Sequence, residues 1–318
     1  MSPDTADRRT SLLVWGALSI VYVVWGSTYL GIMITIETIP PLSSGAMRFT
    51  VAALVLTAAI FLLRGRDALR MTAKEFGGAA LVGLLLLTAG NGMVAVAEQH
   101  ISSGLAALLV ASVPLWLVVL RILARDRPRV LTLTGVLIGF AGVAVLSLTG
   151  GSGAGDAAGI VTILLASLSW SVGSFLSARI PMPANPFTAS AVEMLAGGVG
   201  LALTATVLGE RLDLDAVSGR SWAALAYLIV MGSLVAFTSY VWLLGTAPIS
   251  LISTYAYVNP VVAVALGALI LGEPVTGSMV AAGLVIVVGV ALVVSTERRR
   301  QVVPEEKEPA VAEVAGSA

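Results

Sequence analysis

Apolar residues run along this chain in long stretches, separated by short groups of glycine, proline and charged residues. An α-helix rises 1.5 Å per residue, so about 20 apolar residues cross the ~30 Å hydrocarbon core of a bilayer. Stretches of this length recur from Leu12 to Val294, without the alternation typical of an outer-membrane strand. Because the backbone must satisfy its own hydrogen bonds in hydrocarbon, these stretches predict transmembrane helices.

The interruptions divide the chain into ten predicted spans. They cover residues 12–34, 43–63, 76–96, 102–123, 131–149, 157–179, 187–208, 222–244, 249–271 and 276–295. An even number of spans places both termini on one side of the membrane. Cytoplasmic loops carry the excess of Lys and Arg, and with the N-terminus inside, 15 of the 18 Lys and Arg residues lie at cytoplasmic positions. We therefore expect a multi-pass protein of the inner (cytoplasmic) membrane with both termini cytoplasmic.

Composition supports this class and excludes several others. The chain is 58% hydrophobic and 11% charged, whereas soluble domains carry about 25% charged residues. It has no cysteine and one histidine, His100, which excludes disulfides and a metal centre built from cysteine or several histidines. Net charge is zero with no basic patch, so nucleic acid is excluded as a partner. No cofactor or metal is predicted.

The two halves of the chain resemble each other at a shift of about 145–148 residues. Trp25 aligns with Trp170, Pro114 with Pro260, and "GAMRFTVAALVL" (45–56) with "SAVEMLAGGVGL" (190–201). Each half holds five spans, an odd number, so the second half must enter the membrane from the opposite side. We therefore expect an all-α fold of ten transmembrane helices arranged as a 5+5 inverted-topology repeat, as in many secondary transporters. The predicted units are an N-terminal cytoplasmic tail (1–11), repeat 1 (12–149), an extracytoplasmic linker (150–156), repeat 2 (157–295) and a disordered cytoplasmic tail (296–318).

Two longer motifs resemble a known family. "VVWGSTYLGI" (23–32), an arginine inside span two, and "YVNPVVAVALGALILGEPVTGSMVAAGLVIVVGVALVV" (257–294) are similar to the EamA family of the drug/metabolite transporter superfamily. The resemblance covers the chain from Leu12 to Val294. It implies an inner-membrane exporter of amino acids or other small metabolites. The first repeat departs from the family pattern, because Asp126-Arg127 stands where a glutamate is common.

Two charged residues lie inside predicted spans at matching positions of the repeat. Arg48 lies in the outer half of span two, and its repeat mate Glu193 lies in the inner half of span seven. A charge within hydrocarbon needs a partner, water or a function. Arg48 is a candidate ligand for a carboxylate and Glu193 for an ammonium group or a proton. The alternative is that each pairs locally and fixes helix packing. Their separation of ~15 Å along the helices argues against a direct pair.

Aromatic and polar residues form stripes at helical spacing on several spans. Such faces either line a solute cavity, or pack helices together through small polar residues and aromatic belts. The candidate substrate-binding residues are Tyr22, Trp25, Tyr29, Arg48, Asn91, Trp170, Glu193, Thr238, Thr254 and Tyr257.

Three further polar residues are expected to lie outside the site. Glu98 and His100 end span three, where a solvated loop is favoured over a proton relay. Glu273, in "LILGEPVT" (269–276), follows span nine at the extracytoplasmic side. The inverted repeat places Arg127 at the equivalent cytoplasmic position, so the charge at 273 is interpreted as a record of orientation.

These observations favour a secondary transporter that alternates access to a central site, most readily for amino acids or related zwitterionic or neutral polar solutes. A proton-coupled drug or cation antiporter, the first alternative, would be expected to have a carboxylate within span one. This span has none. A passive channel is the other alternative. A membrane enzyme is disfavoured, since no span or loop offers a catalytic constellation. The expected partners are a small-molecule substrate and the lipid bilayer. Coupling to protons or to a counter-substrate, and a monomer or a homodimer, are equally compatible with the sequence.

Overall fold

The computed structural model describes residues 3–126, 128–149, 154–247 and 255–301. Within these ranges the chain is helical, and no strand occurs. The elements are α1 (Pro3–Thr35), α2 (Pro41–Arg64), η1 (Arg66–Leu69), α3 (Ala73–Gly83), η2 (Leu84–Asn91), α4 (Gly92–Ala97), α5 (Ser103–Val110), α6 (Val113–Leu123), α7 (Val130–Thr149), α8 (Ala154–Ser177), α9 (Pro186–Val207), η3 (Leu214–Ala216), α10 (Gly219–Tyr227), η4 (Leu228–Val235), α11 (Ala236–Thr246), α13 (Tyr255–Leu266), η5 (Gly267–Leu271) and α14 (Gly277–Gln301).

Nine helices of the described ranges are long and apolar enough to cross a membrane. They coincide with nine of the predicted spans. The remaining one, 249–271, begins outside the described residues, and its described part includes the shorter apolar helix Val258–Leu271. Helix also extends beyond two predicted borders, because α1 begins at Pro3 and α14 continues to Gln301. The all-helical membrane class is therefore confirmed.

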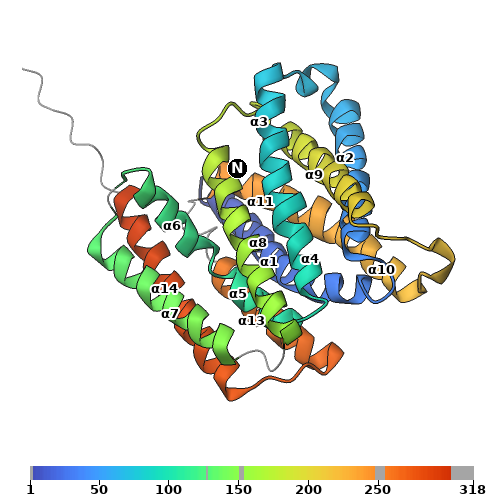
Figure 1. Ribbon diagram of the computed structural model, residues 1–318. Coiled ribbons are helices and arrows are strands. Elements are labelled where there is room, and N and C mark those ends of the chain that lie inside the picture. The colour runs from blue at the N-terminus through green and yellow to red at the C-terminus, as the bar shows by residue number, and fades with distance from the viewer. Residues whose placement is uncertain (1–2, 127, 150–153, 248–254, 302–318) are drawn as a thin grey trace, which may run out of the picture.

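The helices form a bundle with a paired layer at one side (Figure 1). Helices α7 and α14 pack along each other there, whereas α2, α9 and α3 pack together on the opposite side. Between them α1 packs against α13 and α11, and α8 packs against α4, α5 and α6. Most of the largest group of buried apolar side chains lies around α4, α5, α8 and the α7–α14 pair.

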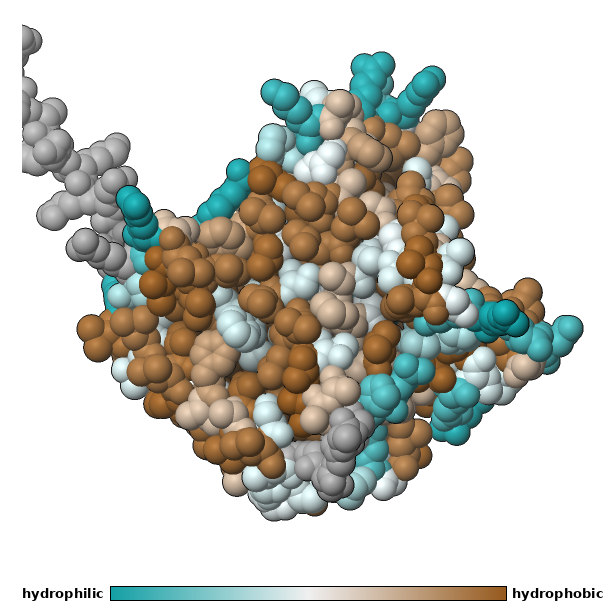
Figure 2. Space-filling model, in the orientation of Figure 1, coloured by the Kyte–Doolittle hydropathy of each residue, from teal (hydrophilic) through white to brown (hydrophobic). Residues whose placement is uncertain are grey.

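The outer surface of the bundle is apolar over most of its height. Figure 2 shows hydrophobic side chains covering the visible face, with hydrophilic ones gathered near the α2–α3 and α9–α10 connections. Fully exposed leucines such as Leu137 and Leu148 on α7 belong to this surface. A soluble protein avoids so large an apolar patch, whereas a bilayer requires it.

Two spans contain π-helical segments in their middle. Residues 84–91 (η2) connect α3 to α4, and residues 228–235 (η4) connect α10 to α11. A π-helix widens the hydrogen-bond spacing from i→i−4 to i→i−5 and is frequent at functional sites. Both segments are continuous with the α-helices around them, so each span stays unbroken. The wider spacing changes the backbone hydrogen bonding and the direction of the side chains in these segments.

Two prolines that align between the halves of the chain, Pro114 and Pro260, behave differently. Span four is interrupted by a turn at Ala111 and Ser112, and Pro114 lies in the first turn of α6, where its missing N–H is not needed. Pro260 lies inside α13, which continues through it. Of these two spans, the helix is interrupted near the proline in span four and continues through it in span nine.

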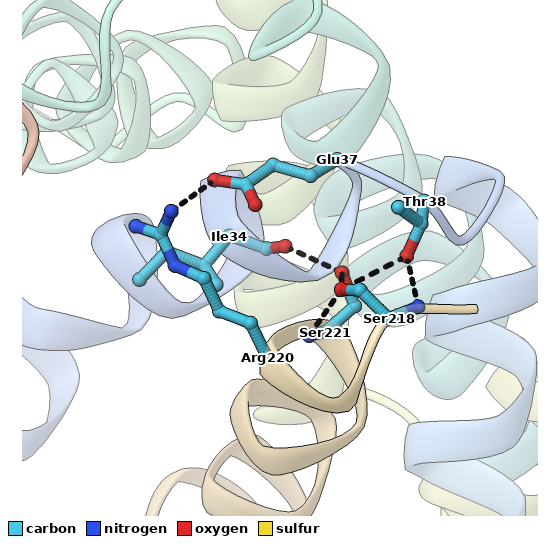
Figure 3. A network of polar contacts seen from close by, with 6 residues as sticks. All are labelled: Ile34, Glu37, Thr38, Ser218, Arg220 and Ser221. Atoms are coloured by element: carbon cyan, nitrogen blue, oxygen red, sulfur yellow. Dashed lines mark hydrogen bonds and ion pairs between the residues drawn. The ribbon is translucent and has the colours of Figure 1, made fainter.

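One end of the bundle carries four glutamates, Glu37, Glu98, Glu210 and Glu273, and is called the glutamate end below. Figure 3 shows how a polar network there ties the end of α1 to the start of α10. Arg220 pairs with Glu37 at 3.3 Å, and Ser221 Oγ donates to the Ile34 carbonyl at 3.0 Å. Glu37 lies in the turn after α1.

Glu210 and Glu273 each cap the first turn of a helix far away in the chain. Glu210 accepts hydrogen bonds from Leu42 N and Ser43 N of α2, at 3.0 and 2.8 Å. Glu273 accepts from Ser103 N and Gly104 N of α5, at 2.8 and 3.2 Å. Each carboxylate thereby satisfies amides that a helix start leaves without partners. Each follows a glycine with positive φ, Gly209 or Gly272. The cap is a role for Glu273 beyond the predicted record of orientation.

The α7–α14 pair depends on close backbone approach at glycines. A Cβ on Gly289 would lie 2.5 Å from Gly139 Cα, and one on Gly135 would lie 2.9 Å from the Gly289 carbonyl oxygen. The hydroxyls of Thr132 and Thr296 hydrogen-bond between the two helices at 2.9 Å. The glycines of spans five and ten therefore face each other.

We expect Gly289→Ala to destabilise the protein by about 1–3 kcal/mol, because the added methyl group overpacks a backbone contact. The measurement is the unfolding temperature in detergent. Gly77→Ala in α3 is the control, since a Cβ there meets nothing within 4 Å. Helix propensity favours alanine at that position by up to about 1 kcal/mol. Equal losses in both variants would contradict the close packing of α7 on α14.

Candidate functional site

Trp25 is the centre of an aromatic cluster between α1, α11 and α13. Its ring lies 5.0 Å from the ring of Tyr240 and 5.3 Å, edge-on, from that of Tyr255. Its Nε1 donates a hydrogen bond to the Gly232 carbonyl in η4 at 3.3 Å. Tyr and Trp combine an apolar ring with a hydrogen-bonding O–H or N–H group. They therefore suit the lining of a binding site that is apolar on one side and hydrogen-bonded on the other.

Arg48 reaches the same π-helical segment from α2. Its Nε donates to Ser233 Oγ at 3.0 Å, and its guanidinium lies 4.8 Å from the Phe49 ring centre. A Cβ on Gly232 would lie 3.1 Å from Nη2, so glycine at 232 lets the guanidinium approach η4. Arg48 is 6% exposed. The charge predicted inside span two is therefore buried against span eight.

The guanidinium of Arg48 is incompletely bonded. Nη1 is buried and has no hydrogen-bond partner among the described residues, and no acidic side chain pairs with the guanidinium in the described ranges. Desolvating a charged donor without a partner is costly. A planar fork with a free donor fits a carboxylate, which can accept two parallel hydrogen bonds.

The three aromatic candidates on α1, Tyr22, Trp25 and Tyr29, pack in two different clusters. Tyr22 and Trp25 pack in one apolar cluster with Tyr240 and Tyr255, whereas Tyr29 packs against the largest core. The Asn259 amide, oriented to satisfy both its polar atoms, donates to the carbonyls of Tyr255 and Tyr22 at 3.2 Å. This bond links α1 to α13 beside the aromatic cluster.

Trp170 on α8 lies against the other π-helical segment. A Cβ on Gly90 would lie 3.1 Å from its ring, and the half-buried Asn91 is the next residue. A cavity of about 20 Å³ beside Trp170 is lined also by Gly90, Val94 and Ser167. It has room for about one water molecule. The structure thus brings Trp170 to the segment that holds Asn91.

Of the remaining candidates, Thr238 bonds within its own helix. Thr238 Oγ1 donates to the carbonyls of Leu234 and Val235 in its own helix, at 2.6 and 2.9 Å. Tyr257 lies in α13, and Thr254 lies outside the described residues.

Glu193 lies on α9, where its backbone contacts Gly83 of α3, and its side chain is half-buried. Helices α2 and α9 pack antiparallel, with Gly45 opposite Leu201 and Gly198 opposite Thr50. Glu193 is therefore displaced along this pair from Arg48. No ion pair joins the two within the described part of the chain.

Several site residues were missed by the sequence interpretation. Ser233, Phe237 and Tyr240 follow an i, i+4, i+7 spacing that marks one helical face, and this signal was available. Gly232 and Tyr255 carried no comparable signal. The prediction of a solvated Glu98 was wrong, because this side chain is 2% exposed, whereas His100 is exposed. Within the described ranges, no three acidic, histidine or cysteine side chains gather as a metal site would require.

An apolar helical bundle with a buried guanidinium and an aromatic cluster between its helices defines an integral membrane protein that accommodates a polar group inside the bilayer. The sequence model of the EamA-like transporter family matches residues 13–148 and again 157–295. This chain belongs to the EamA-like transporter family.

Named relatives agree with that class. The uncharacterized inner membrane transporter YedA of Escherichia coli K12 is 42% identical over 267 residues, which cover 83% of this chain and 85% of YedA. The uncharacterized transporter YvbV of Bacillus subtilis is 26% identical over 296 residues, 90% of this chain and 91% of YvbV. One crystal structure, 24% identical, superposes with a TM-score of 0.62 over 93% of this chain and 99% of that chain, and shares the fold.

We expect Ser233→Ala to destabilise the protein by about 1–3 kcal/mol, because it leaves the buried Nε of Arg48 without an acceptor. The unfolding temperature in detergent measures this. Ser190→Ala is the matched control, since Ser190 is also buried and, among the described residues, its hydroxyl bonds only to Pro186 O one turn earlier. Equal stability of Ser233→Ala and the control would contradict the bond to Arg48.

Proposed function

We propose that this protein is a secondary transporter that exports amino acids or related zwitterionic or neutral polar solutes across the cytoplasmic membrane by alternating access, without a cofactor and without enzymatic activity. Its family and the name of its relative YedA, an inner membrane transporter, support the general class. The substrate and the mechanism are inferred from the site.

The observation that carries the proposal is the buried guanidinium of Arg48 with a free Nη1. Next to it, Trp25 and Gly232 supply an aromatic face and a backbone carbonyl. A solute that places a carboxylate against Arg48 and an apolar or aromatic group against Trp25 has the chemistry of an amino acid. A lipophilic cation would be repelled by the arginine, which argues against a drug or cation antiporter.

The opposite charge of a zwitterion has a candidate partner in Glu193, displaced from Arg48 along the α2–α9 pair. Asn91 and Trp170 on one side, and Tyr22, Tyr29, Thr238, Thr254 and Tyr257 on the other, complete the proposed set of substrate-binding residues. In the alternating-access proposal, a solute contacts these groups in turn as the helices move around it.

The 5+5 inverted repeat is part of the proposal, with residues 12–149 and 157–295 as its two units. Support comes from the family model, which matches the chain in two segments of similar extent. The π-helices η2 and η4 begin 144 positions apart (228 minus 84). Residues with positive φ in the described ranges also pair at this shift: Gly65 with Gly209 (144) and Arg125 with Gly272 (147).

Helix packing gives the repeat further support. By the proposed equivalence, α1 against α13 corresponds to α8 against α5 and α6, and α1 against η4 corresponds to α8 against η2. The pairs α2–α9 and α7–α14 each join equivalent spans. This is the arrangement expected of two units related by a twofold axis in the membrane plane. A passive channel has no need of it.

We expect Arg48→Lys to weaken transport of zwitterionic amino acids by about 10- to 100-fold, because lysine lacks the planar fork that holds a carboxylate at two points. Counterflow in proteoliposomes, with amino acids and their decarboxylated amines as a matched panel, measures the change. The amines should show no comparable loss. Arg66→Lys, an exposed arginine at the opposite end of the bundle, is the control.

Two outcomes would reject this assignment. Equal loss for amino acids and amines would make Arg48 a packing residue. Uptake of quaternary ammonium dyes without flux of any amino acid would favour the cation antiporter instead.

Orientation is tested with single cysteines, since the natural chain has none. We expect Asp213→Cys to react with a membrane-impermeant maleimide in intact cells, and Asp67→Cys to react only after the membrane is permeabilised. Asp213 lies between α9 and α10, and Asp67 between α2 and α3, both exposed. The reverse labelling pattern would place the termini outside.

A further inference from the structure

Glu98 is an acidic residue buried without partners at the glutamate end. It is the first residue after α4, and its N–H donates to the Val94 carbonyl at 3.0 Å. Only 2% of the residue is exposed, and neither carboxyl oxygen has a hydrogen-bond partner among the residues described. The site proposed above does not use it. An ionised carboxylate in such surroundings loses its hydration with no compensation.

The nearest acidic group makes this burial less favourable. Glu273 is close enough to interact electrostatically with Glu98. Its own oxygens are already occupied, by Ser103 N at 2.8 Å, Ser103 Oγ at 3.0 Å and Gly104 N at 3.2 Å. These three donors bond to Glu273 and not to Glu98. When two carboxylates lie close together and one of them is cut off from water, binding of one proton by the pair is favoured. Here the carboxylate cut off from water is that of Glu98.

Other titratable groups around this turn do not supply a counter-charge. Tyr29 on α1 interacts with Glu98 as a phenol, and His100 on the same turn is exposed. On the packed helices, Arg48 of α2 is bonded to Ser233, and Asp156 lies in the first turn of α8. Arg64 of α2 and the charged residues of α1 (Asp4, Asp7, Arg8 and Arg9) lie at the ends of those helices away from the glutamate end. The described ranges place no ion pair on Glu98.

We propose that Glu98 is a proton-binding site that controls the glutamate end: it holds a proton while α4, α5 and the segment after η5 are packed together, and loses it when they separate. The site's ligand is a proton, and the moving element is the contact between the α4–α5 turn and Glu273. Together with the proposed orientation, this makes the external pH a control on outward opening. The inference rests on the proposed transport function for that consequence only.

The direction of the pH effect follows from which state binds the proton more tightly. Burial, and next the carboxylate of Glu273, raise the pKa of Glu98 well above its usual range in the packed state. In the separated state water solvates the carboxylate, and the pKa returns toward its ordinary value. The packed state therefore binds the proton more tightly. Low pH favours packing, and rising pH favours separation, by up to about tenfold per pH unit for one proton.

Hydrogen–deuterium exchange of the wild-type protein in nanodiscs tests this without any transport substrate. After correction for the pH dependence of chemical exchange, uptake at residues 97–106 should rise as pH increases above the ordinary glutamate pKa of about 4.3, and should level off above the raised pKa of the packed state. The neutral variants Glu98→Gln and Glu98→Leu should stay low across this range. Either variant suffices if the other fails to fold.

Glu37→Gln is the matched control, because Glu37 is an exposed carboxylate at the same end of the bundle. It should keep the wild-type pH dependence. Exchange that does not depend on pH in the wild type, or that depends on pH equally in the Glu98 variants, would overturn the proposal. Absence of counterflow for every solute would reject the transport function alone and leave the exchange result standing.

Discussion

Each helix of this protein has to satisfy its backbone hydrogen bonds inside hydrocarbon, and the fold depends on where that constraint is relaxed. In the middle of two spans the helical ladder widens into π segments, and polar side chains gather at these points. In η4, the Gly232 carbonyl accepts a hydrogen bond from Trp25, and Ser233 accepts one from Arg48. The backbone thereby serves as a hydrogen-bonding partner for side chains without breaking the span.

The same constraint explains the distribution of glycine. Where helices approach most closely, at Gly135 and Gly289 or at Gly83 beside α9, a side chain would collide with backbone. Bilayers provide no hydrophobic force between helices, so close van der Waals contact and a few interhelical hydrogen bonds hold the bundle. The bond between Thr132 and Thr296 is one of these.

Sequence reasoning recovered the features that depend on one segment at a time. Span positions follow from the length of apolar stretches, so helices such as α2 and α7 were predicted within a few residues of their ends. That Arg48 lies within a span was evident for the same reason.

The features that depend on distant contacts were not predictable in this way. The partner of Arg48 is 185 residues away. The spacing of Ser233, Phe237 and Tyr240 marks one helical face, but it does not say which helix that face contacts. Burial of Glu98 was missed, because a charged residue after a span is normally solvated. It becomes buried only when Tyr29 and the segment around Glu273 are packed beside it. The π segments likewise lack a distinctive sequence, since their form depends on the helices around them.

The caps made by Glu210 and Glu273 have a consequence for how the protein is assembled. A chain is synthesised from its N-terminus, so α2 and α5 exist before the residues that cap them. Until then the first backbone N–H groups of both helices must donate their hydrogen bonds to water or to lipid headgroups. The final contacts at this end therefore form only once residues 210 and 273 have emerged and inserted. A product truncated before residue 210 therefore lacks both caps, and one truncated between residues 210 and 273 lacks the cap on α5.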